Sequence, residues 1–124
     1  MPLVRISLRR GKSSAHIAAL RHSIYQAMRE TFNVPENDCF ILVSQHDADE
    51  FDPNYLGIAR SNDLVIVQIT CNSGRTLEQK QALYRGIAEN FSTDPGLRPE
   101  DVFINLIEVA KENWSFGNGV AQYA

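Results

Sequence analysis

An internal repeat constrains the fold of this chain more than any other feature. Residues 2–43 and 65–106 align without gaps at an offset of 63 residues. The matched pairs include Gly11 with Gly74, Leu20 with Leu83, Asp38 with Asp101, and Phe40 with Phe103. The two segments share their turn residues as well as their apolar pattern. Such self-similarity indicates one supersecondary unit used twice, which is too few copies for a solenoid.

Each unit is predicted to fold as strand, helix, strand. In the first unit, residues 3–8 are rich in β-branched side chains and a glycine turn follows them. Ser13 or Ser14 is expected to cap a helix whose apolar residues recur every three or four positions. Pro35 ends that helix, because the residue before a proline is pushed out of the helical region. Residues 39–43 then form a short apolar strand.

The second unit repeats this order. Residues 64–71 are predicted as its first strand and residues 102–109 as its last. Thr76 and Gln79 have the spacing of a capping box, which marks the start of the second helix. A Pro-Gly pair at 95–96 ends that helix.

Together the two units predict an α+β fold with the order β-α-β-β-α-β, in a single domain spanning residues 1–124. Helical crossovers require the two strands of each unit to be parallel, so we expect a four-stranded sheet with both helices on one face. Residues 47–61 form a polar, acidic loop between the units. Residues 114–124 carry glycines and apolar side chains, which indicates a C-terminal hairpin or arm that packs on another subunit.

The composition excludes several classes of protein. Apolar residues make up 44% of the chain and charged residues 22%, as in ordinary globular proteins. The net charge of -3 provides no electrostatic surface for nucleic acid and no polybasic membrane patch. No apolar run is long enough to cross a membrane, and residues 1–10 lack the apolar core of a signal peptide. We therefore expect a soluble, cytoplasmic protein without nucleic-acid or membrane partners.

The cysteines and histidines do not indicate a disulfide or a metal site. Cys39 and Cys71 are too few and too far apart for a disulfide framework, and we interpret them as free buried thiols. His16, His22 and His46 lack the spacing of metal ligands. The acidic loop also lacks the glycine and final glutamate of a calcium loop. We expect no metal site.

Pro2 is the first candidate for chemistry. A proline after Met1 normally permits removal of the initiator methionine, which leaves a secondary amine in front of a buried strand. A free α-amino group has a pKa of about 7.7–8.0. An apolar pocket with nearby cations lowers that pKa, whereas a nearby carboxylate keeps the amine cationic. The alternative is an inert Met-Pro start, which is common.

Four other residues are candidates for a binding site. Arg75 precedes the cap of the second helix, where a guanidinium and exposed amides form a natural carboxylate site. Asp38 opens a strand after a turn, and Trp114 and Phe116 are suited to wall an apolar pocket. Taken singly, each has a plain structural alternative: a solvated loop arginine, a turn aspartate, and aromatic anchors for the arm.

Taken together, these motifs resemble the tautomerase superfamily, most closely its malonate semialdehyde decarboxylase branch. The resemblance covers nearly the whole chain. Its segments are the amino-terminal Pro-Leu, Val34-Pro35-Glu36-Asn37-Asp38, Ala59-Arg60-Ser61, Gly74-Arg75-Thr76 and Glu100-Asp101-Val102. The stretch Trp114-Ser115-Phe116-Gly117-Asn118-Gly119 is the most specific part, because proline termini occur throughout the superfamily.

The resemblance implies a homotrimer, with the terminal hairpin of each subunit contacting a neighbour, and a small oxo acid as substrate. It places the catalytic roles on Pro2, Asp38 and Arg75. Arg75 binds the substrate carboxylate, and Trp114 and Phe116 form an aromatic wall. One departure is that the loop before the second helix contains a single arginine, where the decarboxylase pattern often has two separated by one residue.

Two mechanisms fit these residues, and neither needs a metal or an organic cofactor. In a decarboxylase, a protonated Pro2 polarises the aldehyde carbonyl and Asp38 keeps the proline cationic. In an enol/keto tautomerase of phenylpyruvate or 4-oxalocrotonate type, a neutral Pro2 moves the proton while Arg75 holds the carboxylate. The presence of Asp38 favours decarboxylation.

Two further interpretations compete with an active enzyme of this kind. The first is an inactive relic, a trimer that keeps the pocket but has lost its activity, and the absence of a second arginine favours it. A single-stranded RNA-binding module has the same element order, but it needs aromatic residues in the third strand. Residues 64–71 contain none. That strand is instead apolar on both faces, so a monomer would expose a large patch and we expect three sheets packed inward.

Overall fold

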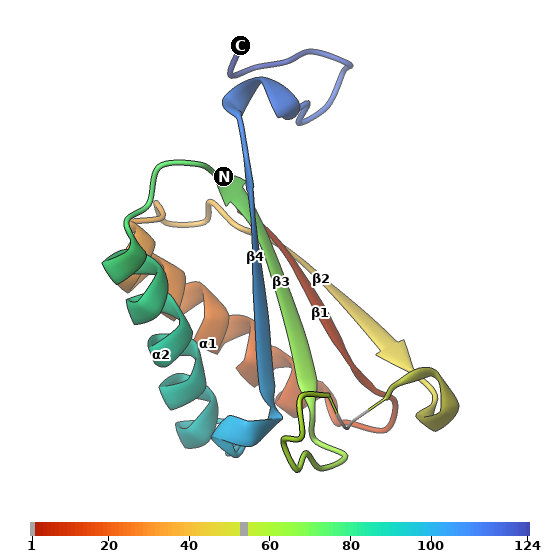
Figure 1. The fold of residues 1–124 in the computed structure, drawn as a ribbon. Helices are drawn as coiled ribbons and strands as arrows, with labels where there is room; N and C mark the ends of the chain where they lie inside the picture. The colour runs from red at the N-terminus through yellow and green to blue at the C-terminus, as the bar shows by residue number, and fades with distance from the viewer. Residues whose placement is uncertain (1, 53–54) are drawn as a thin grey trace.

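A computed structural model describes residues 2–52 and 55–124 and shows a four-stranded sheet with two helices on one side (Figure 1). The strands are β1 (Leu3–Arg9), β2 (Phe40–His46), β3 (Val65–Asn72) and β4 (Val102–Val109). The helices are α1 (Ser14–Phe32) and α2 (Leu77–Thr93). The expected α+β class and β-α-β-β-α-β order are confirmed.

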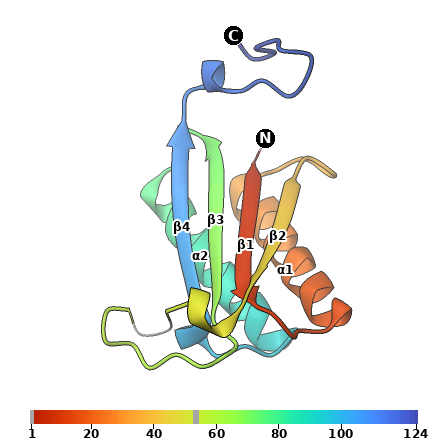
Figure 2. The same ribbon diagram turned by 90° about the vertical axis from the view of Figure 1, so that its right-hand side faces the viewer.

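The sheet has the strand order β2-β1-β3-β4, so the two repeat units meet at its centre (Figure 2). β1 is parallel to β2 and β3 is parallel to β4, as the helical crossovers require. β1 and β3 are antiparallel, with Leu3 opposite Thr70 and Leu8 opposite Val65. The second unit is therefore related to the first by an approximate two-fold rotation. Each unit begins beside the end of the other unit's first strand.

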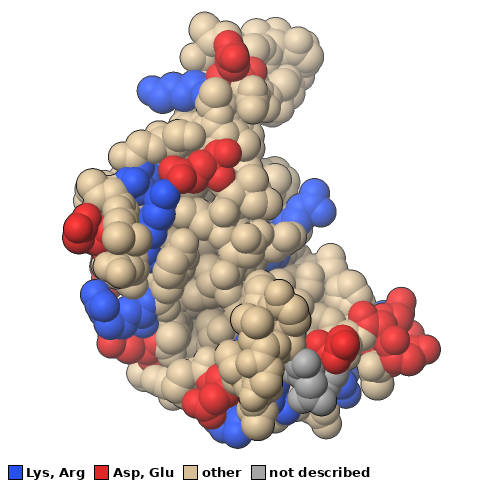
Figure 3. Space-filling view, viewed as in Figure 1, with Lys and Arg blue, Asp and Glu red and all other residues tan. Residues whose placement is uncertain are grey.

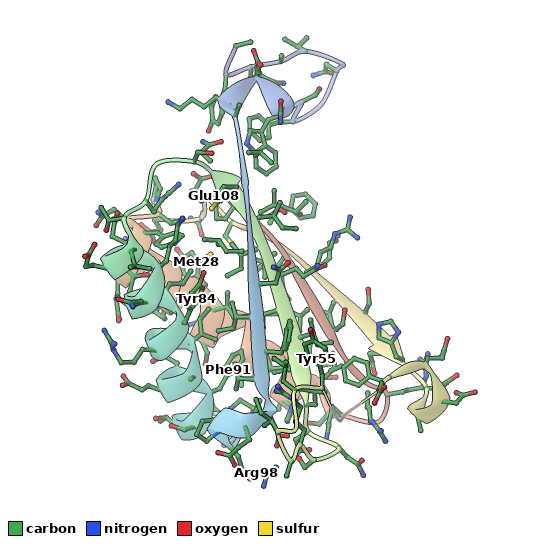
Figure 4. The ribbon with its side chains drawn as sticks, in the orientation of Figure 1. Met28, Tyr55, Tyr84, Phe91, Arg98 and Glu108 are labelled. Carbon is green, nitrogen blue, oxygen red and sulfur yellow. The ribbon has the colours of Figure 1, made fainter. Side chains whose placement is uncertain are left out.

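Side-chain caps start both helices at the predicted residues. Ser13 Oγ accepts a hydrogen bond from the His16 amide at 3.1 Å. Thr76 and Gln79 form the expected capping box, with reciprocal bonds of 3.1 and 3.0 Å. The helices then bury one apolar face each against the sheet (Figure 4), through residues that include Ile24, Met28, Leu83, Ile87 and Phe91. No helix among the described residues is long and apolar enough to span a bilayer.

The opposite face of the sheet is uncovered. Phe40, Leu42 and Ile107 are 57%, 43% and 41% exposed there. In Figure 3 the hollowed surface to the right, between the C-terminal segment and the turn after β2, is largely uncharged. We expected this patch to come from β3, as a strand that is apolar on both faces. That expectation is wrong, because β3 places Gln68 and Thr70 on its half-buried side. The outer strands β2 and β4 supply it instead.

The C-terminal segment differs from the expected hairpin. Residues 110–124, all of which are described, contain a short 3-10 helix (Lys111–Asn113) and turns but no strand. Gly117, Asn118 and Gly119 have φ angles of 145°, 60° and 66°, which turn the chain back on itself. A β-ladder needs a partner strand. This segment projects beyond the sheet of its own chain (Figures 1 and 2), where no such partner lies.

A buried carboxylate holds the segment between β2 and β3, which joins the two units, through hydrogen bonds. Asp101 is 1% exposed, and its oxygens accept hydrogen bonds from Ser61 N at 2.7 Å, Ser61 Oγ at 2.6 Å and Arg98 Nε at 3.3 Å. Burial acts to raise the pKa of Asp101. The hydrogen bonds from Ser61 and Arg98 outweigh burial and hold that pKa below its ordinary value.

We predict that Asp101→Asn lowers the free energy of unfolding at pH 7 by at least about 2 kcal/mol, because it removes charge-assisted hydrogen bonds from a buried site. A lowered pKa stabilises the fold above the ordinary aspartate value of 3.8, and this contribution is lost as the pH falls through the native value. Urea denaturation of both proteins at one concentration, at pH 7 and at pH 3, measures this. The gap between the two stabilities should be smaller at pH 3 than at pH 7, and an equal gap at both pH values would contradict the prediction.

Candidate functional site

The antiparallel centre of the sheet brings the predicted site residues to one end. β1 begins where β3 ends, β2 begins beside β1, and β4 ends beside β3. Pro2 and Asp38 therefore lie at the same end as Arg75 and the segment that starts at Trp114. Figure 2 shows this directly, with the amino terminus just below the C-terminal segment. The fold thus unites residues that the sequence separates widely.

A cleft of about 350 Å³ lies at this end. Its lining consists of Pro2, Leu3, Phe40, Leu42, Trp114, Ser115 and Phe116. Pro2 is buried in the cleft, and most of the lining is aliphatic or aromatic. The structure therefore brings together three of the candidate residues, Pro2, Trp114 and Phe116. Met1 lies outside the described residues.

Trp114 and Phe116 form an aromatic wall that several contacts hold in place. Their rings stack with centroids 5.5 Å apart, and the Tyr123 ring packs edge-on against Phe116 at 4.9 Å. The Gln122 side chain accepts a hydrogen bond from Phe116 N at 3.0 Å and donates one to Gly117 O at 3.1 Å. The turn after the wall is thus closed by its own side chain.

Arg75 lies beside the cleft but does not line it. Its guanidinium sits 4.8 Å from the centroid of the Phe32 ring, and Nη1 donates to Asn72 O at 3.1 Å. Trp114 Nε1 donates to Oδ1 of the same Asn72 at 2.7 Å. Among residues 2–52 and 55–124, no carboxylate forms an ion pair with Arg75. Asn72 therefore couples an arginine without a carboxylate partner to the aromatic wall.

Lys80 and Glu108 form an ion pair near this arginine. Lys80 Nζ donates to Glu108 Oε1 at 2.6 Å, and this hydrogen bond lowers the pKa of Glu108. Figure 4 shows Glu108 near the end of β4, toward the C-terminal segment. The charge of Arg75 also contributes to lowering the pKa of Glu108, after the larger effect of the Lys80 hydrogen bond.

Asp38 is half-buried just before β2 and does not line the cleft. The Phe40 amide donates to Pro2 O at 3.2 Å, which fixes the start of β2 against the start of β1. Leu3 pairs with Phe40, so continuing the parallel register places Cys39 beside Pro2 and Asp38 one residue further out. Adjacent strands lie about 4.8 Å apart. Asp38 itself lies in a turn, where its amide donates to Pro35 O at 3.1 Å, at the same end of the sheet as Pro2.

The two cysteines are free and carry no sign of nucleophilic activation. Cys71 is buried, as predicted, whereas Cys39 is only half-buried. Burial raises the pKa of Cys39 to about 11 and also raises the pKa of Cys71. Both thiols are therefore protonated at neutral pH. No group of three His, Cys, Asp or Glu side chains within the described part of the chain is placed to hold a metal ion.

Sequence reasoning missed several residues that shape the cleft. Phe40 and Leu42 form its floor, and Asn72 holds its wall. Phe40 and Leu42 carried a usable signal, since alternate apolar residues on an edge strand mark an exposed face. The hydrogen bond between Asn72 and Trp114 spans 42 residues and has no local sequence signature.

Comparison with known proteins identifies the class. The family model described as "Tautomerase enzyme" matches residues 38–117. The protein named probable tautomerase YusQ of Bacillus subtilis is 46% identical over 98% of both chains. Probable tautomerase YrdN of the same organism is 31% identical over 99% of this chain and 96% of its own. The chain belongs to the tautomerase family and is an enzyme of that superfamily.

Solved structures agree with this assignment. A malonate semialdehyde decarboxylase described with decarboxylase and hydratase activities is 33% identical, with a TM-score of 0.87 over 98% of this chain and 95% of its own. A second malonate semialdehyde decarboxylase, inhibited by 3-bromopropiolate, is also 33% identical, with a TM-score of 0.90 over 98% and 93% of the two chains. A fused 4-OT described as a symmetric trimer is 22% identical with a TM-score of 0.79 over 95% and 94%, and it shows the fold alone.

We predict that Asn72→Ala releases the aromatic wall, because Trp114 Nε1 loses its 2.7 Å acceptor. Trp114 is the only tryptophan in the sequence, so tryptophan emission, excited at wavelengths where tyrosine does not absorb, reports this site. The emission maximum should shift to longer wavelength while the far-UV circular dichroism stays unchanged. Asn105→Ala is the matched control, since this exposed amide contacts only Gln68 at 3.5 Å. Identical spectra for Asn72→Ala and the wild type would show that the bond does not position the ring.

Proposed function

We propose that this enzyme acts on a small oxo acid through the secondary amine of Pro2 and decarboxylates it in the manner of malonate semialdehyde decarboxylase. The observation that carries the proposal is the burial of Pro2 in an aromatic-walled cleft. Asp38 lies at the same end of the sheet, two residues before β2. Removal of Met1 exposes the amine. Neither the binding step nor the chemical step requires a cofactor.

The charge state of Pro2 decides which reaction follows. An apolar lining lowers the pKa of an amine because it disfavours the charged form, and a neighbouring carboxylate raises it. The cleft supplies the first influence through Phe40, Leu42 and Trp114. We assign the second influence to Asp38, which lies two residues before β2 at the same end of the sheet as Pro2. We assign the larger effect to Asp38, so that Pro2 works as a cation.

In decarboxylation, protonated Pro2 donates a hydrogen bond to the aldehyde oxygen of the substrate. Arg75 holds the carboxylate so that the bond to be broken is aligned with the carbonyl π system. As carbon dioxide leaves, the electron pair of the broken carbon–carbon bond moves into the carbonyl and forms an enolate. Pro2 then donates its proton to the carbon of that enolate, which gives the aldehyde product, and the neutral amine takes up another proton from solvent. The support for Arg75 is its hydrogen bond to Asn72, which also holds the cleft wall.

Enol/keto tautomerisation of phenylpyruvate or 4-oxalocrotonate type is the second candidate function. Two observations favour it: the cleft lining is mainly apolar, and Arg75 is the single arginine in its loop. The relatives named probable tautomerases point the same way. In this reaction a neutral Pro2 removes a proton from the substrate and returns it at another carbon.

The pH-rate profile of Asp38→Asn separates the two functions. If Pro2 works as a cation, the substitution lowers the pKa of Pro2 because it removes a neighbouring negative charge. Decarboxylation of malonate semialdehyde should then fall at least about tenfold, with its upper pH limit shifted downward, while tautomerisation of phenylpyruvate enol persists or rises. Intact mass must first show that Met1 has been removed, because an amide nitrogen neither accepts a proton nor carries the positive charge.

Two control variants make this experiment decisive. Pro2→Ala and Arg75→Ala should each lose at least about tenfold in the preferred reaction without loss of fold. Decarboxylation that ignores Asp38, or that is absent at every pH, would leave tautomerisation as the function. Absence of both reactions in the processed wild type would identify an inactive relic.

We also propose that the enzyme is a homotrimer. The uncovered sheet face with Phe40, Leu42 and Ile107 needs a partner surface, and the C-terminal segment projects away from its own sheet. The fold shared with the fused 4-OT trimer supports three-fold assembly. Multi-angle light scattering at micromolar concentration should give three times the chain mass of 14.0 kDa. Leu42→Glu should lower that mass by placing a charge in the interface, and a monomeric wild type would contradict the proposal.

A further inference from the structure

The internal repeat creates a counterpart of the Arg75 loop at the opposite end of the sheet. The offset of 63 residues matches Arg75 with Lys12, Asn72 with Arg9, Ser73 with Arg10, and Val109 with His46. The backbones agree as well, since Arg10 N donates to His46 O at 2.9 Å and Ser73 N donates to Val109 O at 3.0 Å. The same loop geometry is therefore built twice, once after β3 and once after β1.

A cavity of about 350 Å³ opens at this second loop. Arg9, Arg10 and Lys12 line it together with His46, and Asp47 is the one lining carboxylate. Cations thus outnumber carboxylates three to one in the lining. The counterpart loop of the candidate active site has only Arg75, so duplication has made this copy the more cationic of the two.

The ion pairs in the second loop leave part of this charge unmatched. Arg10 Nε donates to Asp47 at 2.9 Å with both side chains more than half exposed, and Lys12 pairs with Asp63. Arg9 has no ion pair among the described residues, and its buried Nε has no hydrogen-bond partner. A buried donor without an acceptor costs about 1–3 kcal/mol. Arg9 itself lines the cavity, so its unpaired positive charge faces a site that suits an oxyanion.

The segment between the units covers the rest of the counterpart site. Phe103 corresponds to Phe40 of the cleft floor, and the Tyr55 ring lies 6.2 Å from it while the Arg60 guanidinium lies 5.8 Å from it. Figure 4 shows Tyr55 and Arg98 at this end of the molecule, opposite Glu108. Asp101, the counterpart of Asp38, is held by Ser61. Only the cationic part of the second site therefore remains open.

The second site also lacks a reactive group. The counterpart of Pro2 is Val65, whose nitrogen is a peptide amide inside the chain and neither accepts nor transfers a proton. We propose that the cavity formed by Arg9, Arg10, Lys12 and His46 binds a small oxyanion, either a carboxylate or a phosphate, without reacting with it. Charge-assisted hydrogen bonds from guanidinium and ammonium groups recognise both chemistries. This inference goes beyond the proposed function and does not depend on it.

Calorimetric titration tests the site with two probes, inorganic phosphate and malonate, at low ionic strength where surface charge is least screened. The titrations use the Arg75→Ala background, which removes the carboxylate contact proposed for the active site. We expect saturable binding with one anion per chain. Arg9→Gln and Lys12→Gln should each weaken it at least about tenfold. Arg85→Gln, which removes an equal charge from an exposed position on α2, should leave it unchanged.

Each outcome decides one point. Binding of both probes defines a general oxyanion site, and binding of one alone assigns the site to phosphate or to carboxylates. Absence of saturable binding, or equal loss in Arg85→Gln, overturns the proposal. If Arg9→Gln does not fold, Arg9→Lys and the amide chemical shift of Gly11 during titration replace it. In the wild-type background, Arg9→Gln should retain turnover, so a failure here is distinct from a failure of the Pro2 mechanism.

Discussion

The antiparallel pairing of β1 with β3 is the constraint on which the rest of this structure depends. It joins two parallel β-α-β units into one sheet and reverses one unit relative to the other. Without this reversal, Pro2 at the start of the first strand and Asn72 at the end of the third would lie at opposite ends. The same pairing places Lys12 beside the start of the second unit. One set of backbone hydrogen bonds therefore builds both the cleft and its cationic counterpart.

The two ends of the sheet differ in which side chains surround the matching positions of the repeat. At one end, the stacked aromatic rings of Trp114 and Phe116 line a cleft together with a buried proline. At the other end, the joining segment is fastened to buried Asp101 and covers the matching surface. Of the two matching positions, only Pro2 stands near the start of the chain; the counterpart nitrogen of Val65 is a peptide amide inside the chain.

Local signals were sufficient for most of the fold and part of the site. The capping box of Thr76 and the alternation and turn residues around each strand predicted both helices and all four strands, although β2 runs on to His46 because its ladder with β1 continues through polar residues. The predicted hairpin was wrong for the single chain, because residues 110–124 have no strand of their own to pair with. Pro2, Trp114 and Phe116 were each named as candidates, and the structure shows that they line one cleft.

The sequence by itself determined the repeat, the element order and the residue types available for proton transfer, because periodicity, caps and turns act over a few residues. Only the tertiary structure decided which of those residues meet. The hydrogen bond from Trp114 to Asn72, the position of Arg75 beside the cleft and the exclusion of Asp38 from its lining depend on strand register across the sheet. Such contacts join segments that are distant in sequence, and packing of the whole core sets their geometry.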